Sequence, residues 1–359
     1  MQKVKLGDIC TKQSSAYAQK DLNDLEGEYP IYGASGFIKK INIYHQDKDY
    51  VAVVKDGAGI GRTMYLPAKS SVIGTLQYLI PKEGIEPKYL YYAVKSSHLE
   101  KYYTGATIPH IYFKDYQNEP IILYGKDEQI HVVSILEKVE KIIEIRKQEL
   151  KQLEELIKSR FVEMFGHPDT NEKHWKMNTF RDICTVRQGL QIPIAKRLKE
   201  YEEDCYEYIT VQYLHGGKER EYIKSPKPTV ICTKSDILMA RTGNTGMVVT
   251  GVDGVFHNNF FLIDFDRDKY DRNFLVQYLN LDIIQADILR RAGTSTIPDL
   301  NHGEFYKIKV FEPPIELQRQ FNNFGKQLDK SKLIIQKSLD ELETLNEALM
   351  QKYFGGSGV

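Results

Sequence analysis

The chain has 359 residues, and its 49 Lys and Arg residues are balanced by 49 Asp and Glu residues, so the formal net charge is zero. This length exceeds one ordinary hydrophobic core and predicts two domains, or one domain with long appendages. A hydrophobic fraction of 42% with 27% charged residues excludes wholesale disorder or a collagen-like fibre. The balanced charge does not favour nucleic-acid binding, because phosphate affinity usually shows as an excess of Lys and Arg.

Neither a membrane span nor a metal site is expected. Apolar runs such as 51–54 are far shorter than the roughly 20 residues that cross a bilayer, and the N-terminus lacks the pattern of a signal peptide, so we expect a cytoplasmic protein. The four cysteines occur singly, without the paired spacing of a structural zinc site. We expect them to be buried packing residues: Cys10, Cys184, Cys205 and Cys232.

Residues 1–125 are predicted to form a mostly-β domain. The β-rich run 50–54 is followed by the glycine segment 57–61, Gly-Ala-Gly-Ile-Gly. A dinucleotide site would need a helix after these glycines, but residues 62–67 are strand-like and end in proline. The segment is therefore predicted to be a hairpin turn between two strands. Residues 87–103 are predicted to form one helix that ends before Gly105.

A long helix is predicted over residues 126–166. Apolar residues recur there at heptad spacing, which is typical of a coiled coil, and a second column of Ile135, Ile142 and Leu156 widens the stripe. The residues predicted to pack against a partner helix are Leu136, Ile143, Leu150, Leu153 and Ile157.

Residues 167–313 are predicted to form a second mostly-β domain, and residues 314–355 a second long helix. Short β-rich runs lie at 229–232 and 236–240, a glycine hairpin at 241–246, and one helix at 272–291 before Gly293. The packing residues predicted in the second long helix are Leu328, Ile335, Leu339, Leu342 and Leu349.

The two halves are an internal repeat. Thr107-Ile108-Pro109 recurs as 296–298, and the same shift carries Gln129 onto Gln318 and Phe165-Gly166 onto 354–355. Each long helix follows its own domain, so a two-fold relation between the copies predicts an antiparallel pair. The predicted fold is α+β, with two similar mostly-β domains, each followed by a long helix, and the helices packed as an antiparallel coiled coil with pseudo-two-fold symmetry.

Polar side chains suited to reading DNA bases occur in the irregular parts of both domains. Arg, Lys, Asn and Gln make the bidentate contacts that distinguish base pairs, although any one of these residues can equally be an ordinary solvated loop residue. The candidates in the first domain are Tyr32, Ser35, Lys39, Lys55, Arg62, Thr107 and His110. Those in the second are Arg187, Gln188, Gln191, Arg241, Asn244, Arg291, Ser295 and Asn301.

The sequence has no recognisable catalytic motif. A DNA methyltransferase would need an Asn/Asp-Pro-Pro-aromatic element, and the single Pro-Pro pair, at 313–314, follows Glu312 and precedes Ile315. Nucleophile elbows, phosphate-binding loops and paired histidine motifs are also missing. We therefore predict a non-catalytic protein.

Taken together in repeated order, these motifs resemble those of the specificity subunits of type I restriction-modification systems. The residues that carry the resemblance are the segment 29–36, Tyr-Pro-Ile-Tyr-Gly-Ala-Ser-Gly, the glycine hairpins, the Ile-Pro segments 105–109 and 293–298, and the Phe-Gly helix ends. The second copy departs from the pattern, with 189–192 reading Gly-Leu-Gln-Ile. Base-reading residues therefore cannot be transferred between the halves.

The resemblance implies target recognition domains at 1–125 and 167–313, with spacer helices at 126–166 and 314–355. Each domain would read one half of a double-stranded DNA target with an unspecified gap. Two adenine-methyltransferase subunits would bind the chain, and restriction and translocation subunits would join through them. S-adenosylmethionine and ATP would be bound by these partners, and the chain itself would hold no cofactor.

Other functions remain open from the sequence. A related type II assembly would use the same kind of subunit, a coiled-coil scaffold would not touch DNA, and an enzyme would use the glycine segment. The charge is also evenly spread: residues 1–125 carry +2, 126–166 carry −1, 167–313 carry −1 and 314–355 carry zero. A DNA-binding protein with this charge distribution is expected to bind DNA phosphates weakly by itself. Its partners would then supply most of the electrostatic attraction to the DNA backbone.

Overall fold

The computed structural model describes residues 2–105, 109–214, 216, 219–293 and 296–355. The chain divides into two compact units. The first unit comprises Met1–Gln148 and Ile335–Val359, and the second comprises Glu149–Ile334. Each unit therefore contains one domain and one half of each long helix.

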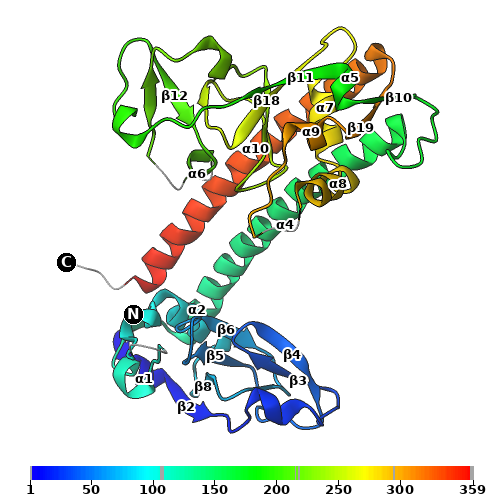
Figure 1. Cartoon of the computed structure of the whole chain (residues 1–359). Coiled ribbons are helices and arrows are strands. Elements are labelled where there is room, and N and C mark those ends of the chain that lie inside the picture. The colour runs from blue at the N-terminus through cyan, green and yellow to red at the C-terminus, as the bar shows by residue number, and fades with distance from the viewer. Residues whose placement is uncertain (1, 106–108, 215, 217–218, 294–295, 356–359) are drawn as a thin grey trace. The chain divides into compact units, whose positions relative to one another are not determined.

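The first domain is built from two sheets and a strand pair (Figure 1). The strands are β1 (Gln2–Lys5), β2 (Cys10–Ser14), β3 (Tyr29–Gly33), β4 (Gly36–Ile41), β5 (Tyr50–Val54), β6 (Thr63–Leu66), β7 (Ser71–Val72), β8 (Leu76–Pro81) and β9 (Pro120–Leu123). The helices are α1 (Leu6–Ile9), η1 (Gln19–Leu22), α2 (Pro87–Ser96), η2 (Leu99–Tyr102) and α3 (Phe113–Tyr116). The larger sheet has the order β2-β8-β5-β6, the smaller β4-β3-β7, and β1 pairs with β9.

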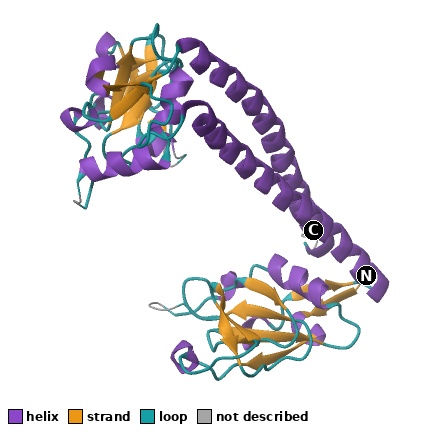
Figure 2. Cartoon of the chain, turned by 90° about the vertical axis from the view of Figure 1, so that its right-hand side faces the viewer, coloured by secondary structure: helices purple, strands orange, loops and turns teal. Residues whose placement is uncertain are grey.

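The second domain has the same plan with an extra strand, and Figure 2 shows its strands gathered together with helices around them. Its strands are β10 (Lys176–Thr179), β11 (Cys184–Gln188), β12 (Cys205–Ile209), β13 (Tyr222–Lys224), β14 (Ile231–Cys232), β15 (Ile237–Ala240), β16 (Val248–Val249), β17 (Gly254–Phe256), β18 (Phe260–Phe265) and β19 (Lys309–Glu312). Its helices are α5 (Phe180–Ile183), η3 (Ile194–Lys196), α6 (Val211–Leu214), η4 (Pro228–Val230), α7 (Arg272–Leu279), α8 (Asp282–Ala292) and α9 (His302–Phe305). The sheets have the orders β11-β18-β15-β16 and β13-β12-β17-β14, and β10 pairs with β19.

The internal repeat is reproduced down to single hydrogen bonds. Lys5 pairs with Pro120 in the first domain, and the equivalent Thr179 pairs with Lys309 in the second. Cys10 Sγ lies 3.3 Å from Leu6 O, and the equivalent Cys184 Sγ lies 3.0 Å from Phe180 O. Burial raises the pKa of both thiols to about 12, so they stay protonated.

The cysteines fill the roles expected of them with one exception. Cys10, Cys184 and Cys232 are buried, whereas Cys205 is half-buried, and all four are free thiols. Among the described residues no group of three His, Cys, Asp or Glu side chains could hold a metal ion.

Each domain is followed by one long helix: α4 (Lys126–Phe165) after the first and α10 (Ile315–Phe354) after the second. In the first unit Lys147 of α4 lies 2.8 Å from Glu343 of α10, and in the second Glu154 lies 3.8 Å from Lys332. The partner number falls as the residue number rises, so the helices run antiparallel. The predicted α+β fold with an antiparallel helix pair is confirmed.

The ten predicted packing residues all lie at least half-buried along these helices, with Leu136 and Leu339 the most buried. The prediction that a second column of apolar residues widens the packed stripe is wrong in part, because Ile142 and Leu156 are 41% and 46% exposed. A two-helix coil covers only one narrow seam of each helix, so residues beside the seam stay in contact with solvent.

A buried glutamine docks the start of each long helix onto its own domain. Gln129 donates from Nε2 to Tyr124 O at 2.9 Å and accepts from the Glu86 backbone N–H at 2.9 Å. The equivalent Gln318 donates to Pro313 O at 2.8 Å and accepts from the Asp271 backbone N–H at 2.8 Å. The carbonyl just before each long helix and the N–H at the N-cap of α2 or α7 are thus satisfied inside the protein.

The two shorter helices differ from prediction. Residues 87–103 form α2 and η2 rather than one helix, because His98 adopts a left-handed conformation with φ of 49°. Residues 272–291 form α7 and α8, which are separated at Leu281, where the backbone is extended and the side chain is buried. In the part of the chain that the structure covers, no helix is both long enough and apolar enough to span a membrane.

Candidate nucleic-acid interface

The glycine segments are hairpin turns, as predicted. Strands β5 and β6 pair antiparallel around residues 55–62, and β15 and β16 pair around 241–247. Gly61 has a φ of +80°, and a Cβ placed there would come within 2.6 Å of the Glu100 backbone nitrogen. Only glycine combines that backbone conformation with such a close approach.

Each hairpin is joined to the loop that follows the Ile-Pro segment of its own domain by the same backbone hydrogen bond. The Ile111 N–H donates to Lys55 O at 2.9 Å, and the equivalent Leu300 N–H donates to Arg241 O at 2.8 Å. In each domain the fold therefore brings together the glycine hairpin, the strand end before it and the loop that carries Ile111 or Leu300. We call this arrangement the latched edge.

A pair of side chains, one acidic and one nitrogen-bearing, closes each latched edge, and the acid comes from the hairpin in one domain and from the loop in the other. In the first domain His110 Nδ1 lies 2.7 Å from Asp56 Oδ1, so the loop supplies the histidine and the hairpin the acid. In the second, Arg241 Nε and Nη2 donate to the two oxygens of Asp299 at 2.9 and 2.7 Å. His110 and Asp299 are equivalent in the repeat.

Electrostatics at the two edges follow from these partners. Burial alone would raise the pKa of Asp56, but hydrogen bonds from Lys55 and His110 bring it below its ordinary value. Burial, followed by the neighbouring charge of Arg241, lowers the pKa of His302 in the second domain. The first edge thus keeps an ionised acid, and the second disfavours the charged form of a histidine.

Other candidates in the second domain are engaged within the protein. Gln188 donates to Asn258 O at 2.6 Å and accepts from Arg241 at 3.3 Å. Asn301 caps α9 by accepting from the Glu304 N–H at 3.0 Å. Arg187 donates to Thr229 O at 3.2 Å, and Arg291 pairs with Asp287 at 2.7 Å.

In the first domain, Arg62 is brought to the turn between β3 and β4. Its Nη1 donates to Ala34 O at 2.9 Å, beside the exposed Ser35. Lys39 donates to Leu22 O at 3.0 Å, away from the hairpin. Lys55 lies 2.5 Å from Asp56.

The remaining candidates do not join these networks. Gln191 and Asn244 lie in exposed loops, and the Asn244 amide reaches Met247 Sδ at 3.3 Å. Thr107 and Ser295 lie outside the described residues. The structure therefore gathers Lys55 and His110 at one edge and Gln188, Arg241 and Asn301 at the equivalent edge.

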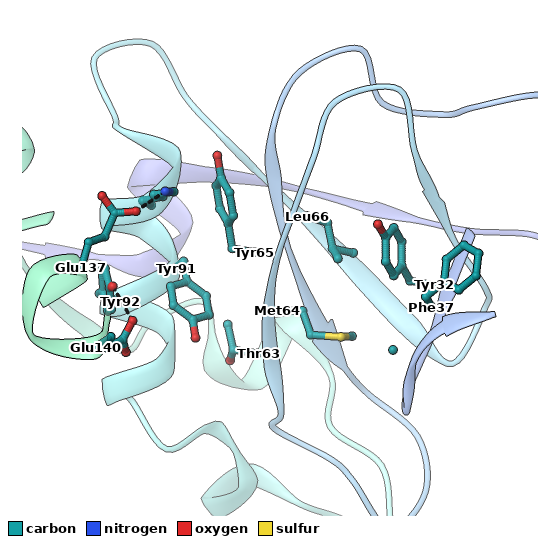
Figure 3. Close-up of a pocket in the computed structure, with 12 residues that line it drawn as sticks. Tyr32, Phe37, Thr63, Met64, Tyr65, Leu66, Tyr91, Tyr92, Glu137 and Glu140 are labelled. Carbon is teal, nitrogen blue, oxygen red and sulfur yellow. Dashed lines mark hydrogen bonds and ion pairs between the residues drawn. The ribbon is translucent and has the colours of Figure 1, made fainter. Parts of the chain in front are cut away.

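Tyr32 lines a different feature, an aromatic cavity of about 530 Å³ in the first unit. Figure 3 shows Tyr32 and Phe37 on one side of the strand that carries Met64 and Leu66, with Tyr91 and Tyr92 on the other side. Its charged groups are neutralised: Lys88 pairs with Glu137 inside the cavity, and Glu140 pairs at 3.1 Å with Lys95, which lies outside the lining. This cavity has no surplus charge with which to attract a phosphate.

Sequence reasoning missed Asp299, which fixes Arg241. Its signal was present, because Asp299 occupies the position that His110 occupies in the first copy. It also missed Lys12 and Lys114, which line a second cavity of the first unit. These two lysines are absent from the second copy, so the repeat could not have revealed them.

Two similar α+β domains, each with a latched edge and each followed by a long helix of an antiparallel pair, define a protein built from a duplicated domain-and-helix unit. The chain matches the family described as type I restriction modification DNA specificity domain over residues 1–155 and 172–344. Since these ranges cover most of the sequence, the chain belongs to that family.

Curated relatives agree with this assignment. The type I restriction enzyme MjaIX specificity subunit of Methanocaldococcus jannaschii is 23% identical over 313 residues, which are 77% of this chain and 70% of that protein. The MjaVIII specificity subunit of the same organism is 24% identical over 181 residues. That match covers 50% of this chain and less than half, 42%, of the relative.

Solved structures share the fold. The S subunit of the type I restriction-modification system from M. genitalium superposes with a TM-score of 0.65 at 18% identity, covering 99% of this chain and 96% of that one. A chain from a study of complex assembly and conformational transition of the type I R-M system gives 0.59 at 15% identity, covering 98% and 97%. At such identities the similarity concerns the fold.

Proposed function

We propose that this chain is the DNA-recognition subunit of a type I restriction-modification complex. Each domain would read one half of a two-part target, and the helix pair would set the unspecified gap between the halves. The observation that carries the proposal is the duplicated latched edge, which presents base-reading side chain types at equivalent places in two domains of a specificity-family chain. Adenine methylation and restriction would be performed by partner subunits, which would bind S-adenosylmethionine and ATP.

The experiment is genome-wide mapping of adenine methylation in cells that express the chain with its methyltransferase partner. A single motif of two short defined parts separated by a fixed gap is expected. A rigid spacer converts two modest half-site affinities into one specific site only when both halves engage together. Methylation of a continuous motif, or of no motif, would contradict the proposal and favour a scaffold.

The gap should depend on helix length. Seven residues inserted after both Leu150 and Leu339, which are equivalent in the repeat, keep the heptad stripe in phase and lengthen the pair by about 10 Å. At about 3.4 Å per base pair, the gap should grow by about three base pairs. Five-residue insertions at the same places are the control, because they rotate the stripe out of phase and should abolish methylation. An unchanged gap with the seven-residue insertions would rule out the spacer role.

The same helices offer two equivalent surfaces for a partner. Ile145 and Leu345 are 42% and 46% exposed in the first unit, and their repeat equivalents Ile334 and Leu156 are 70% and 46% exposed in the second. Ile145 and Leu345 each lie two residues from the Lys147–Glu343 pair, in the same direction along the antiparallel helices. Two such apolar pairs on one chain support the docking of two methyltransferase subunits, one at each pair. Restriction and translocation subunits would join through them.

Glutamate at these positions tests the stoichiometry. An unpaired carboxylate in an apolar interface costs about 3 kcal/mol or more, a factor of roughly a hundred in Kd. Replacing Ile145 and Leu345 together should leave one bound methyltransferase, and replacing all four residues should leave none, as measured by native mass spectrometry. Ile194→Glu is the control, because Ile194 is 76% exposed and belongs to η3 of the second domain and not to a long helix. Two bound copies on the fourfold variant would contradict the assignment.

A further inference from the structure

A second cavity of the first unit, of about 410 Å³, has a different character from the aromatic one. It lies beside the latched edge, between β2, the start of the β5–β6 hairpin and the segment 111–117. Three lysines line it, Lys12, Lys55 and Lys114, and no Asp or Glu does. We call it the lysine pocket.

The charge of this pocket is largely uncompensated. In the described part of the chain neither Lys12 nor Lys114 forms an ion pair, whereas Lys55 shares its charge with Asp56. Lys114 Nζ lies 5.5 Å above the ring of Tyr112, which holds the ammonium group at the rim. Like charges that converge on one cavity repel each other, so an anion bound there would be favoured.

The pocket floor offers neutral hydrogen-bond groups as well. Ser14 and Gln77 line it, and Gln77 is 2% exposed. The Gln77 amide oxygen accepts from Tyr116 at 3.1 Å, which fixes the side chain. Its nitrogen carries two hydrogens and makes one long contact, 3.5 Å to Gln13 O. The floor can therefore donate to a ligand oxygen while the lysines supply the charge.

The equivalent face of the second domain has a different chemistry. Lys12 pairs with Leu79 across the sheet at the place where Val186 pairs with Ile263, so valine replaces the first lysine. Glycine replaces the third, because Gly303 is the repeat equivalent of Lys114. Arg241 stands in place of Lys55, but Asp299 neutralises it. The cationic pocket thus belongs to one copy and is not a requirement of the fold.

We propose that the lysine pocket binds a phosphate group of the DNA backbone next to the first half-site. The inference rests on the proposed function and adds a difference between the two domains to it. The first domain would bind the DNA backbone more strongly than the second. Phosphate contacts fix the register of a protein on DNA without carrying sequence information. A chain of zero net charge would in this way still bind the DNA backbone at one local cationic site.

The test removes two of the lysines from the assembled complex. Lys12→Gln with Lys114→Gln should weaken binding to the target DNA and flatten the slope of log K against log [salt] by about 0.9, the contribution of one phosphate that is no longer neutralised. The methylated motif should stay the same. The control is Lys20→Gln with Lys48→Gln, which removes the same charge from exposed positions of the same domain outside the pocket and should leave the slope unchanged.

The outcomes separate the two proposals. An unchanged slope in a complex that still methylates a gapped motif overturns the lysine pocket alone, whereas the absence of a gapped motif with the native chain overturns the proposed function. Inorganic pyrophosphate provides a second arm. If it stabilises the native complex but not the double variant against heat, while the DNA slope is unchanged, the phosphate comes from a soluble ligand and the assignment to DNA is overturned.

Discussion

Phe354→Ala is expected to lower the free energy of unfolding of the first unit by about 3–5 kcal/mol, the usual cost of truncating a buried phenylalanine. Phe354 is the last residue of α10, yet it packs in the core of the first domain, with ring centroids 5.2 Å from Tyr89 and 6.5 Å from Tyr92. Its repeat equivalent Phe165 ends α4 and packs in the second core, 4.9 Å from Phe274. Each domain core is therefore closed by the helix that begins at the other domain.

The single tryptophan allows the two cores to be followed separately. Trp175 lies in the second unit, and its indole nitrogen donates to Phe165 O at 2.9 Å. In urea titrations Phe354→Ala should shift the transition seen by far-UV circular dichroism but leave the tryptophan fluorescence transition in place, whereas Phe165→Ala should shift the fluorescence transition. Phe37→Ala, at a ring that is 59% exposed, should change stability by less than about 0.5 kcal/mol. Equal shifts of both signals in Phe354→Ala would show that the units unfold together.

The repeat made the architecture predictable from the sequence. Gln129 and Gln318 share a register because both must satisfy the same backbone groups at a helix start, and the heptad spacing of Leu136 and Leu339 follows from the seam they fill. The breaks near His98 and Leu281 escaped prediction. Each depends on a local backbone conformation that the surrounding core imposes, and helical periodicity continues through both.

The interface was only partly predictable. The composition of the loops indicated which side chain types could read bases, but it did not show which of them are held by other residues. Arg241 and Asp299 are 58 positions apart in the sequence, so their pairing appears only once the hairpin and the loop are brought together. The lysine pocket could not be predicted from the sequence for a similar reason, since its three lysines come from β2, the β5–β6 hairpin and α3.

Arg241→Ala is expected to abolish the preference for the second half of the target and to leave the first half intact. The substitution removes both hydrogen bonds to Asp299 and the one to Gln188, and it leaves a carboxylate unpaired at the latched edge. The loss should be about 1–3 kcal/mol of discrimination for each bidentate base contact that the second domain no longer makes. Arg62→Ala, which removes the hydrogen bond to Ala34 O, should have the mirror effect on the first half. Selection of methylated sites from randomised half-sites measures both, and loss of both preferences in either variant would contradict modular reading.

Asp299 decides whether Arg241 reads a base or positions the loop. If Arg241 reads a base, Asp299→Ala frees the guanidinium and preserves the preference for the second half, because the side chain that makes the contact is still present. If Arg241 positions the loop, Asp299→Ala reproduces the loss seen in Arg241→Ala. The bidentate geometry at 2.9 and 2.7 Å uses Nε and Nη2 of Arg241, and Nη1 is taken by Gln188, so we expect the positioning outcome.

The swapped variant, Arg241→Asp with Asp299→Arg, copies the polarity of the His110–Asp56 pair and should restore part of the preference. Rescue would show that the preference depends on the pair between hairpin and loop and not on an arginine at position 241.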